Sequence, residues 1–314
     1  MFSVLNNVNR FLNRIIPVTT PLAAALGLFL PVIFVNFRPF VILLFGIMTF
    51  SGALKLTVRE LGNAVRNPAP LLLFFFVNHV LMPLAALFSS SFVFSNPDII
   101  TGFVLLFAGP TAVSGFIWVF IFKGDKALAL TMILLDTMLA PFIVPATIFI
   151  LLGRKTSMDM SGIAVSLVFM VVVPTILAVA LNEFSRGKIP DAVCPAVEPF
   201  AKICLFLVIA ANSSVISPNV RFDDPVLWTA ALLCIALTVL GFLLAKLNGI
   251  IGKCGSQKGA SLIIAGGLRN NSAVMTIAVT FFPEAAALPT LLCIVFQQII
   301  TAVMGKVLIK NKED

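Results

Sequence analysis

The chain alternates between long apolar runs and short stretches that contain charges, prolines or glycines. About 20 apolar residues are enough for an α-helix to cross a membrane. Runs of roughly this length predict ten spanning helices, at residues 17–36, 39–56, 67–91, 98–122, 127–152, 161–182, 200–217, 226–248, 260–282 and 286–309. Because the runs are continuous and do not alternate in short segments, a β-barrel is excluded. The pattern predicts an all-α polytopic membrane protein.

The first 15 residues precede these spans and have a different pattern. Apolar residues recur there at helical spacing beside Arg10 and Arg14, and no short apolar region with a cleavage site is present. We expect a short amphipathic helix that lies along the membrane interface, and no cleaved signal peptide.

The basic residues of the loops predict how the chain is oriented. All but five of the 21 lysines and arginines fall on the side that holds both termini. The exceptions are Arg38, Arg154, Lys155 and Arg221 on the other side, and Arg269 within a span. By the positive-inside rule both termini are cytoplasmic, and we expect the protein in the plasma membrane, which is the inner membrane of a bacterium.

The loop between the fifth and sixth spans divides the chain into two halves of five spans. The halves are residues 1–152, which include the interfacial helix, and residues 161–309, with a cytoplasmic tail at 310–314. Because five is an odd number, the second half enters the membrane upside down relative to the first. The chain is thus predicted to be a pair of inverted repeats, a common plan for transporters.

The fourth span of each half contains residues that interrupt helices. Gly109 and Pro110 stand in the middle of one span, and Gly266 and Gly267 in the other. Interrupted helices at matching positions of two halves point to a substrate site. We therefore predict a break over residues 265–272 that lines a binding site. The alternative is that the glycine pair permits close helix packing while the arginine that follows reaches the interface.

Five local patterns occur in an order and spacing that resemble one transporter family. They are Gly46-Ile-Met-Thr-Phe-Ser-Gly-Ala-Leu-Lys-Leu-Thr57, Asn78-His-Val-Leu-Met-Pro83, Lys123-Gly-Asp-Lys-Ala-Leu128, Ala140-Pro-Phe-Ile-Val-Pro145 and Gly267-Leu-Arg-Asn-Asn-Ser272. The chain resembles the bile acid:sodium symporter family. The resemblance implies a ten-helix fold in which broken helices four and nine cross.

The chain departs from this family at the positions of the sodium ligands. The family's glutamate is replaced by Ala265, and the glutamine of its signature by Arg269. The other ligand positions fall on Gly115, Phe116, Ala129 and Met132 or Ile133, whose side chains offer no oxygen. Only Asn78 and Asn270 keep polar character. Since sodium needs oxygen ligands, both sodium sites are predicted to be lost.

Three ionisable residues inside the spans are candidates for coupling and charge recognition. Arg269 supplies a permanent positive charge, and Asp136 is the acidic residue well inside a span. We expect these two to pair, either as a structural ion pair or as a gate or proton-linked site. His79 is a second candidate for proton coupling, with a hydrogen-bonded core residue as the alternative.

The polar residues near the two breaks are candidates for substrate binding. They are Arg269, Asn270, Asn271, Ser114, Thr111, Asn78 and Gln297. Hydroxyl and amide groups there can cap new helix starts or hydrogen-bond a ligand. For Gln297 an inter-helix hydrogen bond is the alternative.

Composition removes several other classes of function. The chain has 60% hydrophobic and 11% charged residues, and its net charge is +8. In a membrane protein such an excess of basic residues sets the orientation of the loops, so no nucleic-acid partner is expected. Five scattered cysteines and one histidine predict no disulfide framework, metal site or cofactor. The absence of catalytic motifs argues against an enzyme.

We expect a secondary transporter that carries a small organic anion without sodium, with coupling to protons as an option. The alternatives are a sodium-coupled symporter with altered ion sites, a sensor or a channel, as a monomer or a homodimer.

Overall fold

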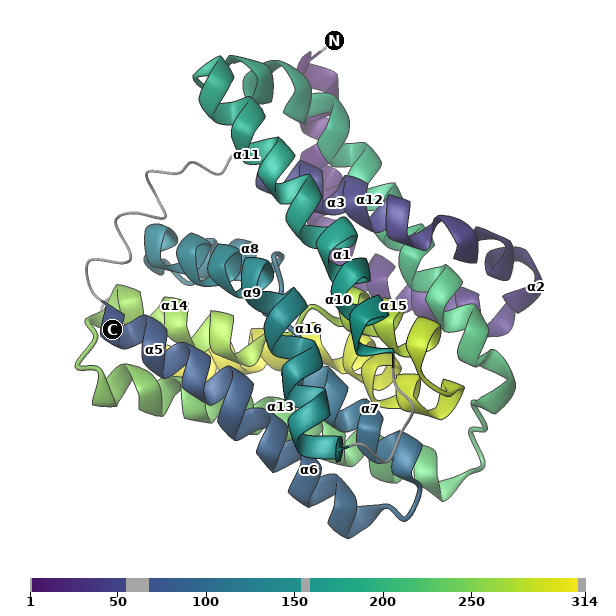
Figure 1. Ribbon diagram of the computed structural model, residues 1–314. Helices are drawn as coiled ribbons and strands as arrows, with labels where there is room; N and C mark the ends of the chain where they lie inside the picture. The colour runs from purple at the N-terminus through teal and green to yellow at the C-terminus, as the bar shows by residue number, and fades with distance from the viewer. Residues whose placement is uncertain (1, 55–67, 154–158, 310–314) are drawn as a thin grey trace.

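The computed structural model describes residues 2–54, 68–153 and 159–309 (Figure 1). These residues form helices joined by short connections, and the described part of the chain contains no strand, only a single two-residue bridge. The all-α class predicted from the sequence is confirmed. The tail at 310–314 and the basic residues Lys55, Arg59, Arg66, Arg154, Lys155, Lys310 and Lys312 lie outside the described residues.

The helices follow one another along the chain with few intervening residues. The first half contains α1 (Phe2–Phe29), α2 (Pro31–Phe34), η1 (Val35–Phe40), α3 (Val41–Ala53), α5 (Pro68–Phe76), η2 (Val77–Leu81), α6 (Met82–Val93), α7 (Pro97–Ala108), α8 (Gly115–Ile121) and α9 (Lys126–Leu152). The second half contains α10 (Met160–Leu167), η4 (Val168–Val172), α11 (Val173–Ser185), α12 (Lys188–Ile216), η5 (Ser217–Asn219), α13 (Pro225–Ile251), α14 (Ser256–Gly267), α15 (Asn271–Phe281), η6 (Glu284–Ala287) and α16 (Leu288–Leu308).

Seven helical stretches are long and apolar enough to cross a membrane. They are Pro31–Ala53, Pro68–Val93, Lys126–Leu152, Met160–Ser185, Ala192–Ile216, Pro225–Ile251 and Glu284–Leu308. Each covers most of one predicted span. The other three predicted spans contain the shorter apolar helices Val18–Phe29, Pro97–Ala108 and Asn271–Phe281. The count of ten spans and their inverted repeat therefore stay a prediction.

Two helices have bounds that the sequence pattern missed. α1 is continuous from Phe2 to Phe29, so the amphipathic stretch and the first span share one helix, whose position relative to lipid stays a prediction. α12 begins at Lys188, twelve residues before the predicted start at residue 200. It continues through Pro195 and Pro199, although proline removes a backbone donor and bends a helix. The prolines and charges before residue 200 led the sequence pattern to place the start of the helix too late. Packing against neighbouring helices keeps this stretch helical.

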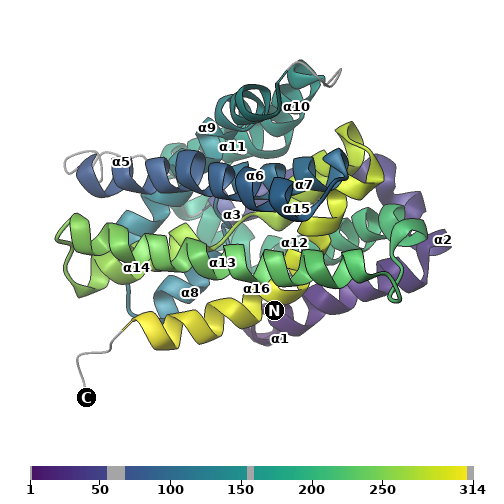
Figure 2. The same cartoon turned by 90° about the horizontal axis from the view of Figure 1, so that it is seen from below.

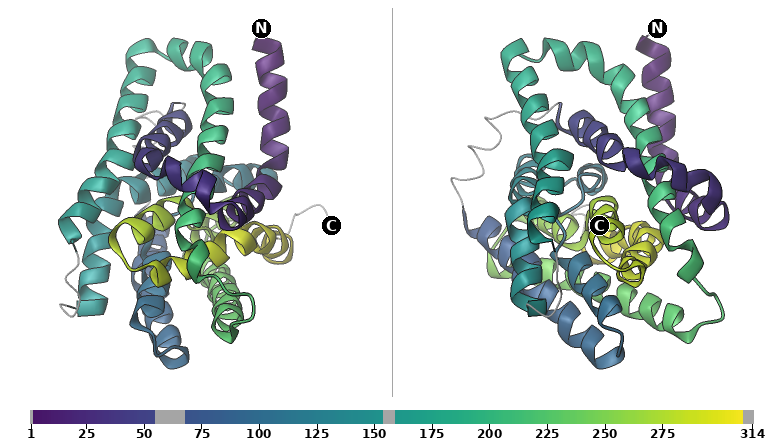
Figure 3. Two further views of the ribbon diagram at one scale, coloured as in Figure 1. Left: turned by 90° about the vertical axis from the view of Figure 1, so that its right-hand side faces the viewer. Right: turned by 45° about the vertical axis from the view of Figure 1, so that its right-hand side comes forward.

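One set of helices, α1, α3, α11 and α12, packs together, and we call it the first helix group (Figure 1). α1 and α12 lie side by side in both views of Figure 3. Gly27 explains their close approach, because a Cβ atom there would lie 2.3 Å from the carbonyl oxygen of Ala210. A larger residue at this position would push the two helices apart.

The second helix group consists of α5 to α9 and α13 to α16, with α13 at its centre. α5 and α6 pass along one side of α13 while α16 lies on the other (Figure 2). The two groups meet where α12 packs against α15, and there the amide of Asn212 donates a 2.8 Å hydrogen bond to the hydroxyl of Thr276. The second group holds both interrupted helices and therefore the candidate site.

Candidate functional site

The two interrupted helices meet through extended backbone. α7 ends at Ala108 and α8 begins at Gly115, while α14 ends at Gly267 and α15 begins at Asn271. The segments between them touch in a single antiparallel bridge of Thr111 with Arg269. Next to the bridge, the amide of Asn270 donates a 2.8 Å hydrogen bond to the carbonyl of Pro110. These bonds satisfy backbone groups that the broken helices leave unpaired.

The glycines near the breaks make room for neighbouring helices. A Cβ atom on Gly109, which follows α7, would lie 2.2 Å from the side chain of Val274 in α15. The helix is interrupted within the predicted range of 265–272, but Gly266 and Gly267 lie before the interruption and form the last turn of α14. Their Cβ atoms would meet Ala245 at 2.6 Å and the ring of Phe242 at 2.3 Å, both on α13. The pair thus serves close packing, as the alternative expected, and the break itself spans residues 268–270.

Arg269 lies in the second break and is buried, with 2% of its surface exposed. Its side chain does not reach an interface, because Nη2 donates a 3.1 Å hydrogen bond to Oδ1 of Asn78. Within the described part of the chain, Nε and Nη1 are buried and have no hydrogen-bond partner. Nδ2 of Asn78 is likewise buried and has no hydrogen-bond partner among the described residues. Buried donors are normally paired with protein, water or a ligand, so these atoms retain the capacity to bind a polar ligand.

Gln297 of α16 holds the backbone of Arg269 from both directions. Its Oε1 accepts from the amide of Arg269 at 3.1 Å, and its Nε2 donates to the carbonyl of Arg269 at 3.0 Å. The side-chain amide thereby pairs with the extended backbone as a neighbouring strand would. The expected inter-helix hydrogen bond is present, and Gln297 positions the arginine.

Asp136 is fully buried in α9 and is held by two donors. Its Oδ1 lies 2.6 Å from Nε2 of His79, and its Oδ2 accepts from the amide of Thr111 at 2.7 Å. Among the described residues, the side chain of Asp136 therefore contacts His79, and the expected direct pair with Arg269 is not formed. Sequence spacing placed both groups at mid-depth but did not fix which way each side chain turns.

A π-helical turn presents Asn78 and His79 to the site. The turn η2 covers Val77–Leu81, and the amide of Met82 donates to the carbonyl of Val77. Pro83 follows, and a proline inside a helix removes one backbone donor and clashes with the carbonyl four residues earlier. The wider π-turn accommodates this carbonyl, and such turns are frequent at functional sites. A polar residue five positions before a proline was the available sequence signal.

The hydroxyl of Thr111 contacts two carbonyl oxygens of the opposite chain segment. It lies 2.6 Å from the carbonyl oxygen of Ala265 and 3.0 Å from that of Leu268. Ala265 itself contributes only a methyl group where the family resemblance implies a glutamate. The threonine thus joins the two breaks through side chain and backbone together.

The remaining candidates lie around this centre with different partners. Asn270 caps α15 by accepting from the amide of Ala273, and Ser114 precedes α8 without a side-chain cap bond. Asn271 is buried, and its Oδ1 has no hydrogen-bond partner among the described residues. The sequence prediction missed Cys293, which donates to Oε1 of Gln297 at 3.4 Å and stands four residues before it, one helical turn away.

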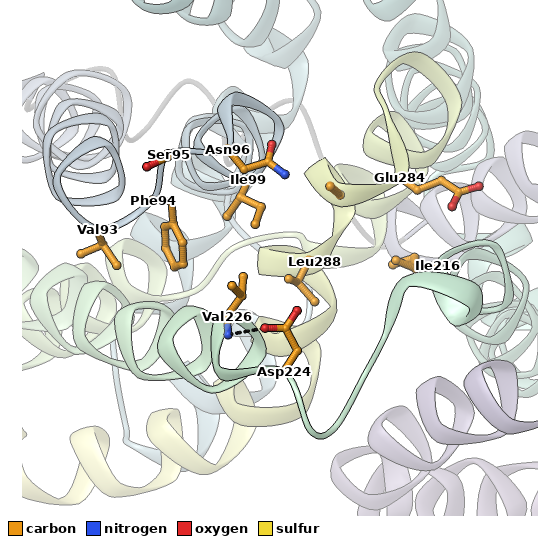
Figure 4. A pocket seen from close by; sticks show the side chains of 11 residues that line it. Val93, Phe94, Ser95, Asn96, Ile99, Ile216, Asp224, Val226, Glu284 and Leu288 are labelled. Carbon is orange, nitrogen blue, oxygen red and sulfur yellow. Dashed lines mark hydrogen bonds between the residues drawn. The ribbon is translucent and has the colours of Figure 1, made fainter.

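A cavity of about 710 Å³ lies away from the crossing, at the end of the second group where α6 ends and α13 and α16 begin (Figure 4). We call it the end cavity, and it is lined by Val93, Phe94, Ser95, Asn96, Ile99, Ile216, Asp224, Val226, Glu284, Ala285 and Leu288. Asp224 caps α13 by accepting from the amide of Val226 at 2.8 Å. No group of three metal-binding side chains occurs among the described residues, here or at the crossing.

Comparison with known proteins gives one consistent result. The sequence model described as the Sodium Bile acid symporter family matches residues 41–220. The protein YbaS of Bacillus subtilis is 36% identical over 93% of this chain and 96% of its own length. A protein of the same organism named as the sodium-dependent transporter YocS is 23% identical over 91% of this chain and 88% of its own. The chloroplastic probable sodium/metabolite cotransporter BASS1 of Arabidopsis thaliana is 26% identical over 74% of this chain and 59% of its own.

Proposed function

Because the chain belongs to the sodium bile acid symporter family, and is thus a multi-pass membrane protein of a transporter family, we propose that it carries a small organic anion. We further propose that this transport does not require sodium. The observation on which the proposal depends is the contact of Arg269 with Asn78 inside the crossing.

The position of the guanidinium argues for a fixed cation in place of a bound one. The family resemblance assigns Asn78 and residue 265 to the sodium-binding region. Here Oδ1 of Asn78 accepts from Arg269, and Ala265 offers no carboxylate. A guanidinium keeps its charge in proteins, so it needs no ion from solution. The same group, with Nε and Nη1 unpaired in the described part of the chain, suits a ligand carboxylate.

The charges of the buried site suggest how a proton accompanies the anion. Arg269 and an ionised Asp136 balance each other when His79 is neutral. An arriving monoanion leaves one excess negative charge, and a buried unpaired charge is unfavourable. Protonation of His79, which already contacts Asp136, restores neutrality. We therefore propose one proton per monovalent anion, with His79 and Asp136 as the coupling pair.

The membrane arrangement belongs to the same proposal. We infer ten spans in two inverted repeats, with both termini cytoplasmic and the end cavity on the outer face. The interruption of one predicted span in each half supports the repeat. The excess of basic residues in the loops next to the termini supports the orientation. Reporter fusions at both termini should give cytoplasmic signals, and a periplasmic signal from one terminus would contradict the ten-span count.

Sodium-coupled anion transport is the second candidate, because the names of two relatives include sodium dependence. Reconstitution separates the two. Uptake of a panel of small labelled mono- and dicarboxylates into proteoliposomes should be saturable, should rise with an inward proton gradient, and should be equal in sodium and choline. A tenfold higher affinity in sodium, which is about 1.4 kcal/mol of coupling, would establish the second candidate instead.

A further inference from the structure

Two buried cysteines face each other across the contact between α13 and α16. Cys234 donates to the carbonyl of Pro289 at 3.7 Å, and Cys293 lies 4.0 Å from the hydroxyl of Thr238. Cys234 and Thr238 are one turn apart on α13, as are Pro289 and Cys293 on α16. This reciprocal pattern places the two thiols opposite each other across the contact between α13 and α16.

The thiols lie between the end cavity and the arginine site. Val226 and Leu288 line that cavity (Figure 4). Cys234 stands eight residues beyond Val226 and Cys293 five beyond Leu288, which are about 12 Å and 8 Å along their helices. Each cysteine is therefore separated from a residue that lines the cavity by only about one to two helical turns.

We propose that Cys234 and Cys293 form a reversible disulfide when a small neutral peroxide enters from the end cavity. One thiol attacks an oxygen of hydrogen peroxide, which yields a sulfenic acid and water. The second thiol attacks the sulfenic sulfur, the S–S bond forms, and a second water leaves. Two thiols are oxidised and one peroxide is reduced, and exchange with a dithiol reductant reverses the change.

Oxidation has a direct consequence for the site, and this part rests on the proposed function. The thiol of Cys293 donates to Oε1 of Gln297, the atom that also accepts from the amide of Arg269. A disulfide removes this S–H donor and ties the first turns of α16 to α13. Since Gln297 holds Arg269 in position, oxidation is expected to slow anion transport several-fold.

The modification is tested first without any transport measurement. Membranes containing the full chain are treated with hydrogen peroxide, then denatured, alkylated and analysed by peptide mass mapping. Treated protein should show three alkylated cysteines of five and a peptide pair linked through Cys234 and Cys293, and dithiothreitol should restore all five. Five alkylated cysteines after treatment, or a link through another cysteine, would overturn the proposal.

Matched variants separate the pair from other buried thiols. Cys204→Ser replaces a cysteine on α12 that is 1% exposed, as are Cys234 and Cys293. On oxidation this variant should still lose two of its four remaining thiols. Cys234→Ser should lose none to a disulfide. Anion uptake should fall on oxidation in the wild type and in Cys204→Ser, but not in Cys234→Ser.

If the disulfide forms and uptake is unchanged, the regulatory part of the proposal is wrong. If no anion is transported by reduced protein, the proposed function fails while the disulfide stands.

Discussion

At the residue scale, the proposed recognition of an anion depends on Arg269. A planar guanidinium binds a carboxylate through two parallel hydrogen bonds, whereas an ammonium is a point charge. We expect Arg269→Ala to weaken carboxylate binding by about 2–5 kcal/mol and Arg269→Lys to weaken it less. Calorimetric titration of the purified protein with the transported carboxylate measures both. Arg221→Ala removes an exposed arginine and serves as the control, with no change expected. Unchanged affinity in a monodisperse Arg269→Ala protein would make this residue structural.

The contact of His79 with Asp136 gives a second expectation at this scale. Residues in contact show interaction energies of about 0.5–3 kcal/mol in double-mutant cycles. We expect a value in this range for Asp136→Asn with His79→Gln, and a smaller one for Asp136→Asn with Arg269→Gln. The physical reason is that the carboxylate contacts the imidazole at 2.6 Å and does not contact the guanidinium. Thermal unfolding in detergent provides the energies, and a larger value for the arginine pair would reverse the assignment.

At the element scale, the packing of α14 on α13 depends on Gly267. A Cβ atom there would overlap the fully buried ring of Phe242. We expect Gly267→Ala to destabilise the fold by about 1–3 kcal/mol, as overpacked cores do. Gly259→Ala, in the same helix but with open space around its Cβ, should be neutral or stabilising by up to about 1 kcal/mol. The comparison of melting temperatures tests the pair, and equal shifts would contradict the packing argument.

The start of α10 gives a pH-dependent expectation. Asp159 caps this helix, and hydrogen bonds from the amide of Gly162 and the hydroxyl of Ser161 lower the pKa of its carboxyl group. A lowered pKa in the folded state means that the cap contributes stability above the unfolded-state pKa of about 3.9 and loses it as pH falls through the folded-state value. Asp159→Asn keeps a good cap but cannot titrate. Its melting temperature should therefore decline less than that of the wild type between neutral and acidic pH, and an identical decline would exclude this contribution.

Element positions were largely predictable from the sequence, because burial in a membrane is a local requirement that each span must satisfy for itself. The site was less predictable. Asp136 and His79 are 57 residues apart, and hydropathy gives the depth of a residue in its span without giving the rotation of the helix. The glycine pair was assigned to a break because Gly-Gly weakens helices, whereas the space between α13 and α14 decides its role. Cysteines count as ordinary apolar residues in such a pattern, so Cys293 was missed.

At the scale of the whole molecule, the hydrogen bond of Asn212 with Thr276 is a polar contact that joins the two helix groups. Thr276→Val leaves the buried amide of Asn212 unpaired, which costs about 1–3 kcal/mol. Thr280→Val, one turn further along α15, removes only a bond to the carbonyl of Thr276 in the same helix, and should change stability by less than about 0.5 kcal/mol. Unfolding in detergent compares the two. Equal effects would show that the contact between the groups contributes nothing of its own.

The π-turn η2 has a consequence for how this chain tolerates changes in length. A π-turn is an α-helix into which one additional residue has been inserted, and each residue turns an α-helix by about 100°. Removing one residue between His79 and Pro83 would restore a regular helix and rotate α5, together with Asn78 and His79, about its axis relative to α6. Asn78 and His79 would then face another side of the bundle with their identities unchanged. The roles proposed for these two residues therefore depend on the number of residues before the proline as much as on their chemistry.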